Sequence, residues 1–442
     1  MVRSHHRIVA ASAALAAALS FTVGSTFASA GAAPTPAQPG LFGSQDPTYD
    51  GVFRQSLALV AYDAAGSTPP AAAVTWLVSQ QCADGGFQAF RPVVSTPCTP
   101  SDPVAYAGED TNSTALAAIA LTRLGRTSEA AKAVAWLEKA RATDGGFPYF
   151  VGGSSDANST ADVLLALTTS GAPSSSTNPA RTFLETLQLA CDGAATSEDG
   201  AFAFQDYGTG LVANDAATVQ VVVALSGSGL PVLPGSSSNA TPRAVCPVPV
   251  PAPPALSAED LGAGYVARLL DTYAGAVPQF DFSSGTRKPG TVSAGDTAWA
   301  VLALAATGRG SAQRDQALAT VTKAAGAAAD DDPGLLALAA LATRAGGGTS
   351  SAVSAYAARI SATMRAAATP SPTPTSTATP APTQSSSATA SSSVVASASS
   401  TDPALPPTGG SPLTLWLAAM GALALAAGAA LVLAATGRGR HA

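Results

Sequence analysis

The stretch Thr114-Ala-Leu-Ala-Ala-Ile-Ala-Leu121 decides the fold, because the same pattern recurs three more times along the chain. The other copies begin at Thr160, Thr218 and Thr297, and each runs seven positions to a final Leu. Apolar residues fill most of every copy, and Gly follows within four positions, as it often does at the end of a helix. A repeat of this kind predicts buried helices with small side chains.

A second pattern alternates with the first. Trp76-Leu-Val-Ser-Gln-Gln leads to Asp84-Gly-Gly-Phe87, and Trp136-Leu-Glu-Lys-Ala-Arg leads to Asp144-Gly-Gly-Phe147, with eight positions from Trp to Asp in both. A looser copy starts at Phe183. We expect the two glycines of each loop to supply positive φ and the Phe to anchor the turn in the core. Each unit is therefore predicted to be a helix, a Gly turn, a second helix and a Gly-Phe loop.

These repeats resemble those of the terpenoid cyclase and protein prenyltransferase superfamily of α/α toroids. The resemblance covers about Asp50 to Ala367 and implies an all-α fold, an (α/α) toroid barrel of about six helix pairs with alternating inner and outer helices. Twelve helices are expected, starting near Val52, Ala71, Asn112, Glu129, Ser159, Pro179, Asp215, Leu261, Asp296, Ala312, Pro333 and Ala352. The repeats are specific for a fold and say little about function.

The chain departs from the catalytic members of that superfamily. Class II terpenoid cyclases carry an Asp-rich acid motif, which the segments starting at Asp110, Asp156 and Asp296 do not reproduce. Asp330-Asp331-Asp332 comes closest, but the Pro333 that follows indicates a helix start. Cyclase cavities are lined with aromatic rings that stabilise cations, and this chain has few aromatic residues. Catalysis inherited from the family is therefore not expected.

The N-terminus has the pattern of a secretory signal peptide over residues 1–30. A basic start precedes an apolar run, and Ala28-Ser29-Ala30 supplies a small-residue cleavage pattern. The mature chain from Gly31 would contain no histidine after both ends are processed, which excludes Ser-His-Asp catalysis and histidine-ligated zinc. Four of the 22 Lys and Arg lie in the removed ends and all 28 acids remain, so the mature net charge is 18 minus 28, or −10. Nucleic acid is not an expected partner.

The C-terminus resembles an LPxTG sorting signal. Leu405-Pro406-Pro407-Thr408-Gly409 precedes an apolar run over 413–435 and a basic tail over 436–442. About 20 apolar residues suffice to cross a bilayer, so this hydrophobic transmembrane segment would hold the chain transiently in the membrane. The resemblance implies that a sortase cleaves after Thr408 and passes the protein to a peptidoglycan precursor. A permanent membrane anchor is the alternative.

The remaining boundaries follow from composition. Residues 31–45 are expected to be a short linker and 46–367 the toroid repeat domain. From 368 to 404 the chain is almost entirely Pro, Ser, Thr and Ala, which predicts a disordered, extended stalk. Such a stalk suits display on the cell wall of a Gram-positive bacterium.

Four cysteines, Cys82, Cys98, Cys191 and Cys246, are an even number in an exported protein, which favours disulfides. We expect sequential pairing, Cys82 with Cys98 and Cys191 with Cys246. Two other pairings remain open, because sequence alone cannot choose among them.

Each predicted inner helix has an Asp at or just before its start. These are Asp50, Asp110, Asp156, Asp215, Asp296 and Asp332. Since the inner helices of a toroid run parallel, these carboxylates should gather at one mouth of the barrel. Asp is a favoured N-cap, and this local reason accounts for each of them. Alternatively the ring, with Glu109, Asn112, Asn158 and Asn214, attracts a cationic or polyhydroxylated ligand or a hard cation such as calcium.

Three function classes follow. The sorting signals and the missing catalytic set favour a cell-wall-anchored, non-catalytic binding or adhesion protein with an extracellular ligand or surface partner. No cofactor is expected beyond calcium at the ring. The first alternative is an extracellular carrier of a small molecule in the barrel cavity. The second is an enzyme, a carboxylate-dependent lyase or hydrolase or a cyclase-like protein, with its acid and base drawn from the ring.

Overall fold

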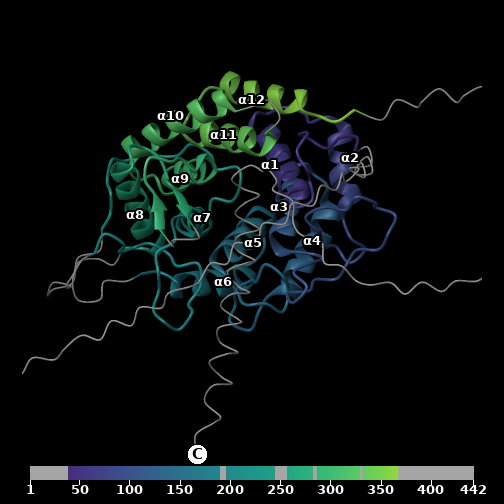
Figure 1. The fold of residues 1–442 in the computed structure, drawn as a ribbon, viewed down its shortest axis with the longest axis horizontal. Helices are drawn as coiled ribbons and strands as arrows, with labels where there is room; N and C mark the ends of the chain where they lie inside the picture. Colours follow the sequence, from purple (N-terminus) through teal and green to yellow (C-terminus); the bar gives the residue numbers. More distant parts are fainter. Residues whose placement is uncertain (1–37, 190–195, 244–255, 282–285, 329–331, 367–442) are drawn as a thin grey trace, which may run out of the picture. The chain divides into compact units, whose positions relative to one another are not determined.

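The computed structural model describes residues 38–189, 196–243, 256–281, 286–328 and 332–366. Within these ranges the chain forms twelve α-helices and one short β-hairpin (Figure 1). The helices are α1 (Gly51–Ala64), α2 (Ala71–Gln80), α3 (Thr111–Arg123), α4 (Thr127–Ala140), α5 (Ala157–Thr169), α6 (Ser174–Thr186), α7 (Asp215–Leu225), α8 (Ala258–Thr272), α9 (Ala294–Thr307), α10 (Ser311–Ala327), α11 (Pro333–Ala345) and α12 (Ser350–Ala362). The prediction of an all-α fold is confirmed.

The odd-numbered helices form a closed ring. α1 packs on α3, α3 on α5, α5 on α7, α7 on α9, α9 on α11, and α11 returns to α1. The even-numbered helices lie outside and each packs on the inner helix before it in the chain (Figure 1). This order defines a toroid of six helix pairs, as the resemblance of the repeats implies.

Burial separates the two kinds of helix. In α3 every residue from Thr111 to Leu121 is buried, whereas α4 buries one face containing Ala133, Trp136 and Leu137. Small side chains let the inner helices approach one another and their outer partners closely. The middle turns of the inner helices are buried.

The repeated threonine explains why the two sequence patterns occur together. The hydroxyl of Thr114 accepts a hydrogen bond from the backbone N–H of Phe87 at 2.9 Å, and Thr160 and Thr218 do the same for Phe147 and Phe202, also at 2.9 Å. Thr297 accepts from Val277 at 3.0 Å in the degenerate copy. Each Gly-Phe loop is thereby tied to the inner helix that follows it.

The two glycines of the first loop have different roles. Gly85 has φ +109°, as expected, and a Cβ there would lie 2.4 Å from the carbonyl oxygen of Lys132. Gly86 does not adopt positive φ, so that part of the expectation was wrong. It leaves space for its neighbours, because a Cβ would lie 2.6 Å from Glu109 Oε1 and 2.7 Å from the indole of Trp136.

The ordered toroid begins earlier than residue 46. Leu41 and Phe42 are fully buried, and the backbone of Phe42 pairs with Met364 near the end of the described chain. Gly40 donates to the carbonyl of Arg365 at 3.0 Å. The part of the expected linker from residue 38 onward therefore belongs to the domain and closes it.

Several predictions fall outside the described residues. They are the signal peptide, the stalk, the sorting motif, the hydrophobic segment over 413–435 and the pair Cys191 and Cys246. Among the described helices, none has the length and apolarity needed to span a membrane. The structure does contain a disulfide between Cys82 and Cys98, with 5.7 Å between the Cα atoms.

A hairpin that the sequence analysis did not predict lies between α8 and α9. Strands β1 (Gln279–Asp281) and β2 (Thr286–Lys288) pair antiparallel, with Phe280 opposite Arg287. Its importance is positional, because it brings Arg287 to the start of α7.

Candidate functional site at the amino-terminal mouth of the barrel

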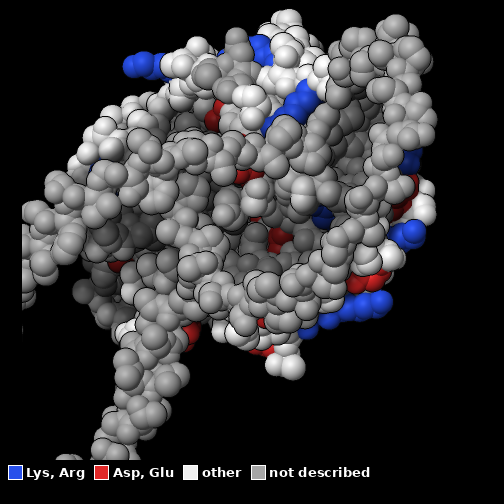
Figure 2. All heavy atoms as spheres, turned by 45° about the vertical axis from the view of Figure 1, so that its right-hand side comes forward, with Lys and Arg blue, Asp and Glu red and all other residues white. Residues whose placement is uncertain are grey.

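The amino termini of the inner helices meet at one end of the ring. Val52 at the start of α1 donates to Ala89 at 2.8 Å, and Thr111 at the start of α3 donates to Tyr149 at 3.0 Å. Each acceptor belongs to the loop that leads into the next inner helix. The loops and helix starts therefore form one continuous mouth, where the six predicted Asp residues lie. Acidic side chains of described residues are visible on the face that Figure 2 shows.

Three of the six act as helix caps. Asp110, Asp156 and Asp332 are N-caps, and their carboxylates accept from the backbone N–H of Ser113 at 2.7 Å, Ser159 at 2.8 Å and Leu335 at 3.0 Å, respectively. The local explanation from helix capping is thus correct for half of the ring.

Two others are neutralised by arginine. Asp50 makes no cap bond and instead pairs with Arg54 at 2.9 Å, with both side chains buried. Asp215 is the first residue of α7, where Asn214 is the cap. The Asp215 carboxylate contacts Arg287 Nε at 2.7 Å and accepts from the Tyr265 hydroxyl at 2.6 Å. Neither carboxylate is available as an uncompensated charge.

Asp296 lies in the first turn of α9, two positions past its start, and accepts from the hydroxyl of Ser293 at 2.6 Å. Burial raises the pKa of Asp296 to about 6, although the Ser293 bond opposes the shift.

The remaining charge is concentrated where α3 and α5 begin, in three carboxyls that we call the acid cluster: Asp110, Asp156 and Asp162. Burial raises the pKa of Asp110 to about 7 and of Asp156 to about 6, against the lowering effect of hydrogen bonds from Ser113 and Ser159. No described Lys or Arg pairs with any of the three.

Asp162 is the member that sequence reasoning missed. It lies within α5, is 1% exposed, and its Oδ1 has no hydrogen-bond partner. Burial, and then the charges of Asp156 and Asp110, raise the pKa of Asp162 well above its ordinary value. Its signal was a lone carboxylate inside the apolar repeat Thr160-Ala-Asp-Val-Leu-Leu-Ala-Leu167. Helix capping cannot explain an Asp at that position.

Other polar atoms near the cluster are also unsatisfied. Asp110 Oδ2 and Asn158 Oδ1 are buried without partners, while Asn158 donates to Gln220 at 2.7 Å. Asn112 accepts from Thr111 at 3.2 Å. Asn214, also proposed for the ring, is occupied as the cap of α7, where it accepts from the N–H of Ala217 at 2.9 Å.

Glu109 directly precedes Asp110 in the chain and lies beside the disulfide. Burial and the neighbouring Asp84 carboxyl raise the pKa of Glu109 to about 8. Its carboxylate and the sulfurs of Cys82 and Cys98 all lie within 4.8 Å of one another, but disulfide sulfurs are not metal-ligating thiolates. In the described part of the chain, the carboxylates of the ring form no such three-ligand group.

Aromatic rings border the acid cluster. Tyr106 stacks on Tyr149 with 6.0 Å between centroids and contacts Phe150 edge-on at 4.8 Å. Tyr106 has φ +53°, an uncommon conformation for a non-glycine residue that concentrates at functional sites. Burial raises the pKa of Tyr149 well above its ordinary value, and the charges of Asp110 and Asp156 add to this shift.

Exposed apolar side chains are frequent in the segments that lead into the inner helices. Of the eleven large apolar residues that are exposed in the described ranges, nine lie in loops leading into inner helices: Tyr49, Val93, Val94, Val104, Tyr106, Tyr207, Val212, Phe280 and Val292. Concentrated exposed apolar surface marks interaction sites more often than scattered residues do. The mouth therefore combines an acidic floor with an apolar rim.

The closed ring of six helix pairs defines the class of protein, an all-α toroid. No protein-family model matches the chain, and no curated protein matches it. Similar solved structures include ent-copalyl diphosphate synthase from Streptomyces platensis, with 18% identity, a TM-score of 0.42, and 67% of this chain and 50% of that chain covered. The chain thus spans half the length of the synthase.

Two further solved structures are similar. A protein from Actinoplanes has 16% identity and a TM-score of 0.41, with 69% of this chain and 79% of that chain covered. A geranylgeranyltransferase-I from Candida albicans, complexed with GGPP, has 13% identity and a TM-score of 0.26, with 38% and 48% covered. The toroid assignment is based on the helix order and contacts of this chain, not on these likenesses.

Proposed function

We propose that this chain is a non-catalytic binding protein displayed on the bacterial cell wall, and that its toroid binds a cationic group at the acid cluster. The observation that carries the proposal is Asp162, a carboxyl that is fully buried, lacks a partner and faces the charges of Asp110 and Asp156. A buried polar group without a partner is destabilising, so its presence calls for a reason beyond folding.

A bound ammonium group would supply the missing counter-charge. It would favour the ionised carboxylates, and the stacked rings of Tyr106 and Tyr149 lie where they can contact the cation or its apolar substituent. The apolar rim favours a ligand that carries hydrocarbon next to its charge. A peptide amine or another organic cation has this chemistry.

Binding can be tested with phenethylammonium as a probe on the full chain, with phenethyl alcohol as its neutral analogue. We expect saturable binding of the amine alone, and a loss of at least tenfold in Asp162→Asn. Asp315→Asn, at an exposed position on α10, is the matched control. Equal binding of the alcohol, or unchanged binding by Asp162→Asn, would contradict the proposal.

Proton release gives a second test of the same site. Because the pKa is raised to about 7 in Asp110 and to about 6 in Asp156, a cation that binds the ionised forms displaces protons. Affinity for the amine should therefore rise between pH 5.5 and 8. A calcium titration at pH 8 tests the hard-cation alternative. If calcium competes with the amine, the ligand of this site is a metal ion and not an organic cation.

Display on the cell wall is a separate part of the proposal, supported by the signal-peptide pattern and by the motif Leu405 to Gly409 with the apolar run after it. The partners would be a sortase and a peptidoglycan precursor. We expect Thr408→Ala to move the protein from the wall fraction to the membrane fraction of the producing cells. Wild-type protein found solely in membranes would favour a permanent anchor.

An enzyme is the second candidate, favoured by carboxyls that stay protonated near neutral pH and could act as general acids. Carboxylate-dependent hydrolases and lyases, and cyclase-like reactions, begin with such a proton donor. Native mass spectrometry of the protein with its co-purified material distinguishes the cases. A retained, unchanged small molecule supports a binder or carrier, whereas conversion of that molecule, lost in Asp162→Asn, supports an enzyme.

A further inference from the structure

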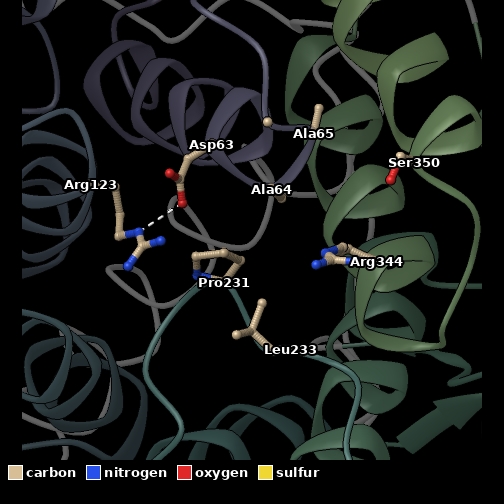
Figure 3. A pocket seen from close by; sticks show the side chains of 9 residues that line it. Asp63, Ala64, Ala65, Arg123, Pro231, Leu233, Arg344 and Ser350 are labelled. Atoms are coloured by element: carbon tan, nitrogen blue, oxygen red, sulfur yellow. Dashed lines mark hydrogen bonds and ion pairs between the residues drawn. The ribbon is translucent and has the colours of Figure 1, made fainter.

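A pocket of about 260 Å³ lies at the opposite end of the toroid, where inner helices terminate (Figure 3). Its lining comes from the ends of α1, α3 and α11, from the loop after α7 and from the start of α12. The residues that matter for its chemistry are Asp63, Arg123, Pro231, Leu233, Arg344 and Ser350. None of them belongs to the acid cluster, so this pocket is independent of the function proposed above.

Two guanidinium groups and one carboxylate give the pocket a net positive charge. Arg123 uses Nε to pair with Asp63 Oδ2 at 2.7 Å, which leaves its two terminal nitrogens without a partner among the described residues. Arg344 approaches from the other side, and its guanidinium has no hydrogen bond or ion pair within the described chain (Figure 3). Both cations can therefore bind an anion without losing an existing carbonyl contact.

The usual structural role of arginine near helix ends does not account for Arg344. A cation in the last turn of a helix is favoured by the dipole and often bonds a terminal carbonyl. Elsewhere in this protein arginines donate to carbonyls near the end of a neighbouring helix, Arg181 to Leu225 of α7 at 2.7 Å and Arg359 to Ala325 of α10 at 2.9 Å. Arg344 donates to no carbonyl in the described chain, although it lies one residue from the end of α11.

The floor of the pocket is apolar and fixed in place. Leu230 donates from its backbone to the Thr169 hydroxyl at 3.0 Å, and Val232 is buried. These contacts hold the loop so that Pro231 and Leu233 face the two arginines (Figure 3). Leu233 is 60% exposed, whereas Pro231 and Val232 directly before it are buried.

We infer that this pocket binds a small organic carboxylate. The carboxylate group bonds the guanidinium of Arg344 and the free terminal nitrogens of Arg123, and the hydrocarbon part packs on Pro231 and Leu233. Guanidinium groups match the geometry of carboxylates, and these bonds are stronger than neutral ones. A net charge of one positive unit selects a monoanion, and Ser350 lies beside the pocket as a hydroxyl partner.

The test uses butyrate on the full chain, with ligand-observed NMR to measure saturable binding, and with butanol and inorganic phosphate for comparison. Butyrate should bind more tightly than either, because the alcohol lacks the charge and phosphate lacks the hydrocarbon. Arg344→Gln should weaken butyrate at least tenfold, and Leu233→Ala should weaken it about threefold. Lys323→Gln, which removes an exposed cation from α10, should leave binding unchanged.

Three results would overturn the inference: no saturable binding of butyrate, equal affinity for butanol, or phosphate binding more tightly than butyrate. Arg344→Lys keeps the charge but loses the planar fork, so we expect intermediate affinity. If Arg344→Gln binds butyrate as tightly as the wild-type chain while melting at the same temperature, the arginine does not form the site. The amine at the acid cluster should not compete with butyrate.

Discussion

The hydroxyl of Thr114 accepts the backbone N–H of Phe87 at 2.9 Å and donates to the carbonyl of Asp110 at 2.7 Å, so one side chain joins a loop to the start of α3. The N–H of Phe87 is buried, and no backbone acceptor replaces the threonine. Thr218 makes the same two bonds, accepting from Phe202 at 2.9 Å and donating to the carbonyl of Asn214 at 2.7 Å. Thr160 accepts from Phe147 at 2.9 Å in the same way, but its hydroxyl donates to the Phe147 carbonyl at 3.3 Å. The repeat in the sequence is thus a repeat of hydrogen bonds as well as of apolar residues.

Replacing Thr114 by Val should destabilise the toroid by about 1 to 3 kcal/mol, because the shape is kept while the N–H of Phe87 loses its acceptor. Urea unfolding followed by circular dichroism measures the change. Thr114→Ser retains the hydroxyl and should remain closer to the wild-type stability. If Val and Ser have the same effect, the hydrogen bond is not what the repeat preserves.

Gly85→Ala should be more damaging than the same substitution at Gly125. Both glycines have positive φ, at +109° and +67°, but a Cβ at Gly85 meets the Lys132 carbonyl at 2.4 Å whereas a Cβ at Gly125 meets open space. We expect a loss of about 1 kcal/mol at Gly125 from backbone strain and at least about 2 kcal/mol more at Gly85. Equal losses would show that the loop moves away from α4 at little cost.

The sequence predicts much of the fold because the pattern of one inner helix and its preceding loop recurs along the chain. The segments that begin at Thr114, Thr160, Thr218 and Thr297 predict four of the inner helices, α3, α5, α7 and α9. The full set of six pairs with alternating inner and outer helices is what the resemblance to the α/α toroids implies. The hairpin between α8 and α9 was missed, since three-residue strands carry too few residues for a periodic signal. The role of residues 38–45 was missed because their partners lie more than 300 positions away, at the end of the domain.

The candidate site was predicted less completely. A ring of equivalent Asp residues is a reasonable expectation from repeats, but each position acquires different neighbours. Arg287 contacts Asp215 although the two residues are 72 positions apart in the chain. No sequence pattern near Asp215 predicts this partner. Arg54, by contrast, follows Asp50 by four positions on one helix face and could have been predicted as its partner. Asp50 and Asp215 each pair with an arginine, whereas the three carboxyls of the acid cluster pair with no described Lys or Arg.

The pair Arg287 and Asp215 can be examined with a double-mutant cycle. Arg287→Gln leaves the largely buried carboxylate of Asp215 with the Tyr265 hydroxyl as its remaining bond, so we expect a loss of about 1 to 2 kcal/mol after allowing for partial exposure of the arginine. Adding Asp215→Asn should recover part of that loss. Additive effects in the cycle would show that the hairpin is held by other contacts.

The Cys82–Cys98 disulfide should stabilise the loop that carries Tyr106 toward the acid cluster. The two cysteines are 16 positions apart, and closing a loop of that length is worth about 3 kcal/mol on the chain-entropy model. We expect Cys82→Ser with Cys98→Ser to lower the free energy of unfolding by about 2 to 3 kcal/mol. The same variant should weaken binding of phenethylammonium, and unchanged binding would separate the disulfide from the site.

Stability should fall as pH rises from about 4 to about 7, because in this range the native state holds protons that the unfolded chain has released. The pKa of Asp110 rises from 3.8 to about 7 on folding. Between these values the native protein binds more protons than the unfolded one, so the free energy of unfolding decreases with pH and the loss is complete above about pH 7.

Asp110→Asn keeps the N-cap and removes the titration, since Asn caps as well as Asp does. The variant should match the wild type near pH 4 and exceed it by about 1 to 3 kcal/mol at pH 8, measured by urea unfolding across that range. Asp102 provides the opposite case, because the N–H groups of Ala105 and Val104 lower its pKa, so Asp102→Asn should not gain stability at pH 8. A wild-type profile that rises from pH 4 to 8 and is unaltered by Asp110→Asn would show that this carboxyl is ionised in the folded protein.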